Sequence, residues 1–195
     1  MNSLPPADRK VRPMVYALFA QGLTLWPRLQ GVQIIGHEHL PLQGRVILAG
    51  GHQSALDPFL AALGTRRFIH YMAKKELFKN SILGWFMTNG GSFPIDRQSK
   101  TDIGAIRKAL EVLEGEGVLG IFPQGTRGGQ EGMGGVAYLA LKAKAPIVPM
   151  SILFHKRRWR VRYGVPISPE GSVKTLTEQV MSAIGTLDEL TRQSN

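Results

Sequence analysis

The sequence predicts an α/β fold: a single-domain layered sheet, mixed and largely parallel, flanked by helices. Three observations predict it. Short apolar runs typical of strands alternate with longer segments of helical periodicity. The 195 residues amount to about one domain, long enough to bury a core without disulfides or metals. Apolar residues make up 43% of the chain and charged residues 19%, a balance that argues against intrinsic disorder.

The predicted strands are short apolar segments, several of them bounded by glycine or proline. They span residues 32–35, 45–49, 67–72, 118–122, 147–154 and 159–163. The last segment is expected to pair with the one before it, because only a short turn separates the two.

One predicted helix begins at residue 59, and three more span residues 101–116, 134–145 and 175–190. The segment 101–116 is the clearest, because its isoleucines and leucines recur at the spacing of one helix face and glycines close it. Ser99 and Asp102 have the spacing of a capping box at its start.

Composition limits the chemistry without fixing it. Cysteine is absent, which excludes disulfides, cysteine-ligated zinc, iron–sulfur clusters and a thiol nucleophile. The net charge of +10 indicates an anionic partner: nucleic acid, a phosphorylated metabolite, an acidic protein or an acidic lipid surface. Composition does not choose among these.

Two apolar stretches bear on membrane contact. Residues 14–26 lie between cations but are too few to cross a bilayer, which takes about 20 residues. They predict either a buried core helix or a helix lying in the membrane interface. A second stretch, residues 74–87, places three lysines beside bulky apolar side chains and leaves the same two alternatives open.

Of the five histidines, only one has a setting that favours chemistry. His37 and His39 lack the spacing of zinc ligands, so both are expected on the surface and no metal site is expected. His70 lies inside an apolar strand and is expected to be a core histidine with hydrogen-bond partners.

His52 directly follows a predicted strand, at the edge where open α/β sheets place their sites. Asp57 follows five residues later, and a turn between strand and helix is needed for the two side chains to meet. If they do, Asp57 orients the imidazole and leaves Nε2 of His52 free as a general base. The alternative is that Ser54 caps the following helix, with Asp57 as its capping-box partner, and that His52 merely lies in the loop.

Residues 122–127 (FPQGTR), with the glycines that follow at 128 and 129, predict a glycine-rich loop between a strand and a helix. Its backbone N–H groups are suited to an oxyanion, and Arg127 to phosphate oxygens. No Lys-Ser/Thr pair follows, which excludes a P-loop. A dinucleotide-binding fold is not expected either, because the sequence lacks the acidic residue that such a fold has about 20 residues further on. Arg97 ends another extended run, and alone it would be an ordinary surface residue beside Asp96.

Residues 155–163 place five cations among aromatic side chains. On a strand, Arg158, Arg160 and Arg162 share one face, whereas Trp159 and Tyr163 share the other. A nucleic-acid binder would need the aromatics beside the cations for stacking. The alternation therefore argues against nucleic acid, and a basic strip suits lipid headgroups, a phosphorylated coenzyme or an acidic carrier protein.

Four motifs in order, GHQSALD at 51–57, GSFPIDR at 91–97, FPQGTR at 122–127 and VPMSI at 148–152, resemble the 1-acylglycerol-3-phosphate acyltransferase family. The resemblance covers residues 30–165 and implies a glycerolipid-acyltransferase-like fold. It implies acyl transfer from a thioester, acyl-CoA or acyl-acyl carrier protein, to the hydroxyl of a lysophospholipid, without a further cofactor. It also implies that His52 is the base and Asp57 its orienting partner, and that the acceptor's phosphate binds to Arg97, Gly125, Thr126 and Arg127.

We therefore expect residues 31–195 to form an acyltransferase domain that converts 1-acylglycerol-3-phosphate to phosphatidic acid. Residues 1–30 are expected to dock on an anionic membrane surface, at the cytoplasmic face of the cell membrane, without spanning it. Two departures from the family pattern, Gln124 in place of Glu and Gly51 in place of Asn, keep another lysolipid acceptor open as the alternative.

Overall fold

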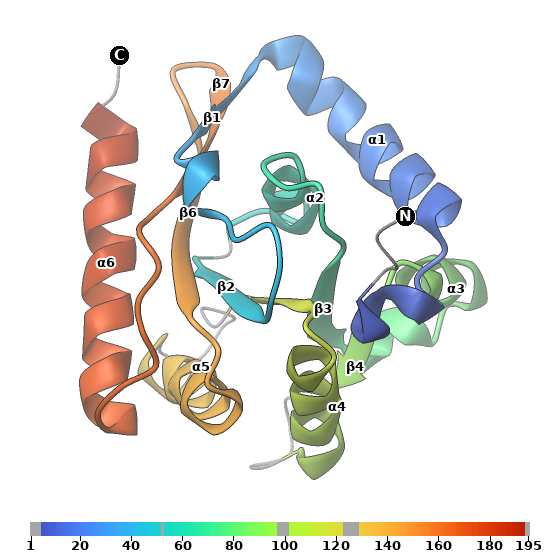
Figure 1. Ribbon diagram of the computed structural model, residues 1–195. Helices are drawn as coiled ribbons and strands as arrows, with labels where there is room; N and C mark the ends of the chain where they lie inside the picture. Colours follow the sequence, from blue (N-terminus) through green and yellow to red (C-terminus); the bar gives the residue numbers. More distant parts are fainter. Residues whose placement is uncertain (1–4, 52, 97–101, 123–128, 194–195) are drawn as a thin grey trace.

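The computed structural model describes residues 5–51, 53–96, 102–122 and 129–193, which form one seven-stranded sheet with helices on both faces (Figure 1). The strand order is β1-β7-β6-β2-β5-β3-β4. Neighbouring strands are parallel except β6 and β7, which form an antiparallel hairpin. The strands are β1 Val32–Ile35, β2 Val46–Gly50, β3 Ile69–Lys74, β4 Phe93–Ile95, β5 Val118–Ile121, β6 Ile147–His155 and β7 Arg158–Tyr163. The predicted fold class, a mixed and largely parallel sheet, is confirmed.

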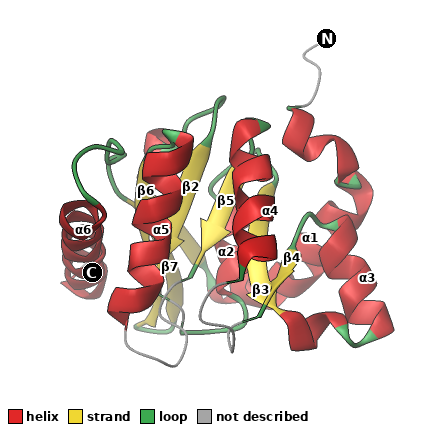
Figure 2. Cartoon of the chain, turned by 90° about the horizontal axis from the view of Figure 1, so that it is seen from below, coloured by secondary structure: helices red, strands yellow, loops and turns green. Residues whose placement is uncertain are grey.

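The helices divide between the two faces of the sheet (Figures 1 and 2). The helices are α1 Pro13–Gln30, α2 Asp57–Ala62, α3 Ser81–Asn89, α4 Ile103–Glu114, α5 Gly129–Ala143 and α6 Val173–Gln193, with short 3₁₀ turns η1 Pro6–Lys10, η2 His37–His39 and η3 Lys75–Phe78. α4, α5 and α6 cover one face, α2 covers the other, and α1 packs on α2 and α3.

The central strand β2 shows why both faces need helices. All five of its residues are buried. Ile47 and Ala49 belong to the apolar cluster beneath α4, α5 and α6, whereas Val46 and Leu48 belong to the cluster beneath α2. Successive strand residues point to opposite faces, so a parallel strand covered on both sides is apolar throughout.

The six predicted strands are present with small shifts of their bounds, but α5 begins at Gly129 rather than at 134. Glycine costs about 1 kcal/mol in a helix interior relative to alanine, which is why the glycine-rich run predicted a longer loop. Packing overrides that cost, because Met133, Val136 and Ala137 are fully buried against the sheet.

The start of α4 differs from the predicted capping box. Asp102 is itself the N-cap, and its carboxylate accepts a hydrogen bond of 2.9 Å from the backbone N–H of Ala105. Ser99 lies outside the described residues. An aspartate one position before the helix is sufficient as a cap.

The basic run on β7 does not form the exposed strip that its alternation predicted. Arg160 is only 2% exposed, and its guanidinium donates to the backbone carbonyl of Thr191 in α6 at 3.2 Å. α6 therefore covers this face of β7. On the other face, Tyr163 is buried as expected.

Helix α1 contains residues 14–26 and has two contrasting faces. Val15 and Thr24 are buried against the rest of the chain, whereas Met14 and Leu25 are more than half exposed. Across the described residues, no helix combines the length and the apolar character needed to span a membrane.

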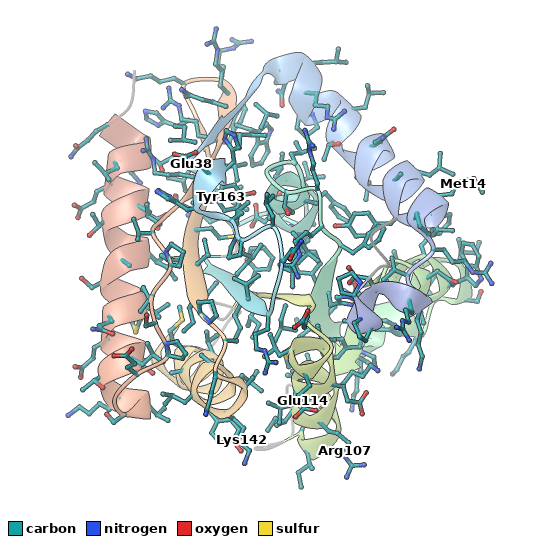
Figure 3. The ribbon with its side chains drawn as sticks, in the orientation of Figure 1. Met14, Glu38, Arg107, Glu114, Lys142 and Tyr163 are labelled. Carbon is teal, nitrogen blue, oxygen red and sulfur yellow. The ribbon has the colours of Figure 1, made fainter. Side chains whose placement is uncertain are left out.

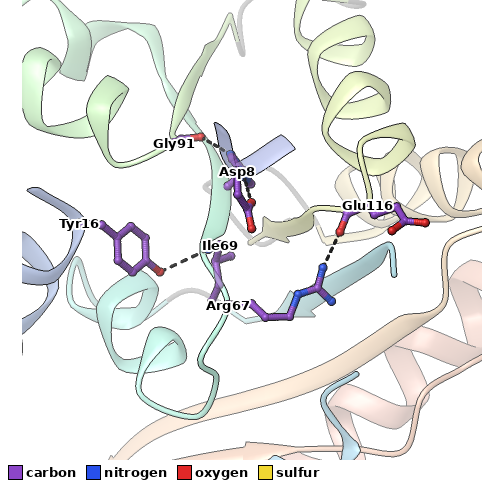
Figure 4. A network of polar contacts seen from close by, with 7 residues as sticks. Asp8, Tyr16, Arg67, Ile69, Gly91 and Glu116 are labelled. Carbon is purple, nitrogen blue, oxygen red and sulfur yellow. Dashed lines mark hydrogen bonds and ion pairs between the residues drawn. The ribbon is translucent and has the colours of Figure 1, made fainter. Parts of the chain in front are cut away.

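His70 is the core histidine that the sequence predicted. Its Nε2 lies 2.9 Å from Oδ1 of Asp8, and its Nδ1 lies 3.0 Å from the backbone carbonyl oxygen of Gly91 (Figure 4). Both members of the His70–Asp8 pair are buried. Asp8 belongs to η1, so the pair fastens the amino-terminal segment to β3.

Two backbone hydrogen bonds add to this attachment. The N–H of Ala7 donates to Gly115 at 3.1 Å, and the N–H of Arg12 donates to Asn89 at 2.9 Å. The segment before α1 is thus fixed to the end of α4 and to the end of α3.

Candidate functional site

Three of the four motifs lie at the carboxyl ends of strands at one edge of the sheet. GHQSALD follows β2, GSFPIDR contains β4 and continues past its end, and FPQGTR follows β5, whereas VPMSI lies inside β6. In the parallel registers, Ala49 of β2 lies beside Ile121 of β5, and Lys74 of β3 lies beside Ile95 of β4. In Figure 2 the arrow of β5 points to the lower side of the molecule, where this edge lies. The carboxyl ends of parallel strands form the usual position of a site in an open α/β sheet.

Asp57 is the predicted site residue whose side chain the structure describes. It is fully buried at the start of α2. Its Oδ2 accepts hydrogen bonds from the backbone N–H groups of Gln53 at 2.7 Å and Ser54 at 2.8 Å. Burying a carboxylate is costly unless such bonds stabilise it. They hold residues 53–57, the turn that leads into α2, in a closed conformation.

The alternative interpretation, in which Ser54 and Asp57 form a capping box, is correct only for Asp57. The carboxylate of Asp57 accepts a hydrogen bond from the backbone N–H of Ser54, as a capping-box partner does. The hydroxyl of Ser54, however, accepts from Leu56 at 3.2 Å, within the turn. Asp57 therefore fixes the turn, and its second oxygen, Oδ1, is also buried. His52 lies outside the described residues, so its role stays a prediction.

The two residues that flank positions 97–101, Asp96 and Asp102, are hydrogen-bonded to each other. The backbone N–H of Asp96 donates to Oδ2 of Asp102 at 2.7 Å, so the residues on either side of 97–101 are joined. The hydrogen bond from the backbone N–H of Asp96, and to a smaller extent that from Ala105, lowers the pKa of the Asp102 carboxyl below its ordinary value. The ammonium group of Lys75 forms an ion pair with the carboxylate of Asp96. The hydrogen bond within this pair raises the pKa of Lys75. Arg97 itself lies outside the described residues.

The third motif begins where β5 ends. Phe122, its first residue, stacks on Tyr71 of β3 with ring centroids 5.9 Å apart and planes 16° apart. Gly125, Thr126 and Arg127 lie outside the described residues. The structure thus brings the flanks of these three motifs to one edge of the sheet, while the roles of all six predicted site residues, Asp57 included, stay predictions.

Sequence reasoning missed two residues that support this edge, Tyr71 and Lys75, and gave Asp102 only as the capping-box partner of Ser99. Asp102 carried a signal, because an aspartate before a helical pattern predicts a cap. The partners of Tyr71 and Lys75 lie 13 and 21 residues away, and no spacing in the sequence indicates such pairs.

Comparisons with known proteins agree with the fold and the motifs. The sequence model of the family described as Acyltransferase matches residues 31–153. The chain is 32% identical over 148 residues to the 1-acyl-sn-glycerol-3-phosphate acyltransferase of Bacillus subtilis, covering 70% of this chain and 74% of that one. It is 32% identical over 191 residues to the enzyme of the same name from Streptococcus pneumoniae, covering 88% and 71%.

A solved structure has the same fold. The 1-acyl-sn-glycerophosphate (LPA) acyltransferase PlsC from Thermotoga maritima superimposes with a TM-score of 0.74 over 93% of this chain and 80% of that chain, at 22% identity. The chain belongs to the Acyltransferase family, and it is an acyltransferase.

Proposed function

We propose that this chain transfers a fatty acyl group from an acyl thioester to the free hydroxyl of 1-acylglycerol-3-phosphate, giving phosphatidic acid. The observation that carries the proposal is the buried Asp57, which two amides hold at the carboxyl edge of the sheet, five residues after His52. The names of the relatives support the acceptor. The donor is acyl-CoA or acyl-acyl carrier protein.

In the proposed reaction, Asp57 accepts the Nδ1 proton of His52 in a hydrogen bond, so that Nε2 is the base. Nε2 removes the proton of the acceptor hydroxyl as its oxygen attacks the thioester carbonyl carbon. The carbon–sulfur bond then breaks, and the sulfur leaves as a thiolate. The thiolate takes the proton from the imidazolium, which returns His52 to its neutral form and releases the ester and a thiol.

Phosphate recognition is assigned to two segments. Arg97 follows β4, and Gly125, Thr126 and Arg127 follow β5. A guanidinium group binds phosphate through paired hydrogen bonds, and backbone N–H groups of a glycine-rich loop add donors. Gln124 keeps the length of the Glu usual in the family but not its charge, so acylation of a different lysolipid is the second candidate function.

The direct test is a mass-spectrometric screen of the purified protein against a lysolipid panel with both donor types. We expect 1-acylglycerol-3-phosphate to give the highest kcat/KM. Monoacylglycerol is expected to be at least tenfold poorer, because it lacks the phosphate that the arginines bind. Equal rates with monoacylglycerol would contradict phosphate recognition, and a higher rate with another lysophospholipid would establish the second candidate.

We further propose that α1 docks the enzyme on the cytoplasmic face of the membrane, where the thioester donors are present. Four apolar side chains on its outer face are 60–75% exposed: Met14, Leu18, Leu25 and Leu29. Their spacing of 4, 7 and 4 residues places them on one side of a helix. Exposed apolar stripes of this kind indicate a contact surface.

The neighbouring helix extends this surface. α3 packs against α1 (Figure 1) and exposes Ile82 and Trp85. Lys79 is exposed beside them, and Arg12 and Arg28 are exposed near the ends of α1. Apolar side chains beside cations suit an anionic lipid surface. Met14 points outward from α1 in Figure 3.

Replacing Leu18 and Leu25 together with glutamate is expected to lower binding to anionic phospholipid vesicles at least tenfold, measured by co-sedimentation. The expectation follows because burying one leucine contributes about 1.5–3 kcal/mol and the added charges repel the lipid. The matched control is Val165→Glu. The side chain of Val165 is as exposed as those of the two leucines, but it lies after the end of β7 and not on α1. If the double variant binds vesicles as the wild type does, α1 is not the docking surface.

A further inference from the structure

We propose that Tyr71 and Tyr163 are positioning residues that hold α2, and with it Asp57, at the catalytic edge of the sheet. Each tyrosine hydroxyl donates to a backbone carbonyl of α2. Tyr71 donates to Pro58 at 2.6 Å, and Tyr163 donates to Ala61 at 2.6 Å. The inference rests on the proposed function, because it assigns a purpose to the position of Asp57.

α2 needs external support. It has six residues, and isolated helices shorter than about 12 residues are marginal in water. The last four carbonyl groups of any helix also lack partners within it. Ala61 is one of these four residues and is fully buried, so water does not satisfy its carbonyl group. The hydroxyl of Tyr163 supplies the donor, while that of Tyr71 donates to the carbonyl of Pro58 in the first turn.

The two donors come from well-separated strands. Tyr71 is on β3 and Tyr163 on β7, and β6, β2 and β5 lie between these strands. α2 therefore lies across the centre of the sheet (Figure 1) and is held at its first and its last turn. Two anchors at opposite ends fix both the position and the direction of a short helix.

The chain makes room for both rings. A Cβ atom at Gly120, beside Tyr71 on β5, would lie 2.2 Å from the Tyr71 ring. A Cβ at Gly64, just after α2, would lie 2.4 Å from the ring of Tyr163. Burial raises the pKa of Tyr71 and of Tyr163 above the ordinary value, so both hydroxyls are protonated donors at neutral pH.

The ring of Tyr71 has a further contact, with the third motif. It stacks on Phe122, the residue that leads into the segment of Gly125 and Arg127. One side chain thus contacts both the helix of Asp57 and the strand end that precedes the proposed phosphate-binding residues. Misplacement of a catalytic group by about 1 Å can cost about a hundredfold in rate, so holding these two segments at a fixed separation has a direct effect on turnover.

The test compares three tyrosine-to-phenylalanine variants, each of which keeps the ring and removes one buried hydroxyl. Tyr71→Phe and Tyr163→Phe are each expected to lower kcat about tenfold and to leave the acceptor KM within about twofold. The matched control is Tyr16→Phe. Tyr16 is partly buried, and burial raises its pKa to about 12. Its hydroxyl accepts from the backbone N–H of Ile69 at 3.3 Å, so the hydrogen bond that Tyr16→Phe removes is to β3 and not to α2. Tyr16→Phe is expected to keep kcat within twofold of wild type.

A second measurement does not depend on activity. Amide hydrogen exchange of Gln53 and Ser54 reports on their hydrogen bonds to Asp57, and we expect it to accelerate at least fivefold in the Tyr71 and Tyr163 variants only. If kcat and exchange in these variants match those of the Tyr16 control, the inference is wrong. If the wild type transfers no acyl group to any acceptor, the proposed function fails, whereas the exchange measurement still decides whether the tyrosines hold Asp57.

Discussion

Replacing His52 with alanine is expected to abolish acyl transfer, with kcat lowered at least a thousandfold, while the protein remains folded. The reason is that an alcohol is a poor nucleophile until a base removes its proton, and general-base catalysis contributes about 10²–10⁴ in rate. The fold is expected to persist because the elements on either side are held by other contacts: β2 is buried on both faces, and α2 is bonded to Tyr71 and Tyr163.

The measurement is a steady-state assay with 1-acylglycerol-3-phosphate, paired with circular dichroism to confirm the fold. His37→Ala is the matched control, because the side chain of His37 is 67% exposed and lies on η2, outside the four motifs. Turnover within tenfold of wild type in the His52 variant would show that His52 is not the base.

Replacing Asp57 with asparagine is expected to lower kcat about 10²–10⁴-fold with a smaller effect on the acceptor KM. Asparagine keeps an oxygen that accepts from the N–H groups of Gln53 and Ser54, so the turn is preserved. It lacks the negative charge that stabilises an imidazolium at His52, and its amide can favour the wrong tautomer of the ring.

This variant separates the two interpretations of Asp57. If its carboxylate only closes the turn as a cap, the asparagine variant will turn over within about threefold of wild type, because asparagine is also a good cap. If the charge serves His52, the loss persists in a protein of wild-type secondary structure. Asp188→Asn on α6, on the far face of the sheet, is the matched control and is expected to keep full activity.

Local patterns predicted the elements of this fold well. The strand at β2 was predictable because four apolar residues follow one another between Arg45 and Gly50, as in a strand covered on both faces. α4 was predictable because its apolar side chains recur at helical spacing. The start of α5 was not, since the burial of Met133 and Val136 depends on a sheet that local propensity does not describe.

The side-chain partners depend on contacts between distant segments. Asp8 meets His70 across 62 residues, and Tyr163 meets Ala61 across 102 residues. Neither pair follows from spacing or composition. Arg160 shows the same limit, because a charged residue on an alternating strand predicts exposure, yet α6 covers it and Thr191 accepts its hydrogen bond. The motifs for the site were visible, whereas the contacts that hold their flanks in place were not.

The buried Asp8–His70 pair has a consequence for how the enzyme meets lipid. A docking helix joined to the rest of the chain by a flexible linker would leave the orientation of the acyltransferase domain relative to a membrane variable. Here the Asp8–His70 pair joins the segment just before α1 to β3, and backbone hydrogen bonds join the same segment to the ends of α3 and α4. If α1 docks on a membrane as proposed, this attachment holds the catalytic edge of the sheet in one orientation relative to the lipid surface.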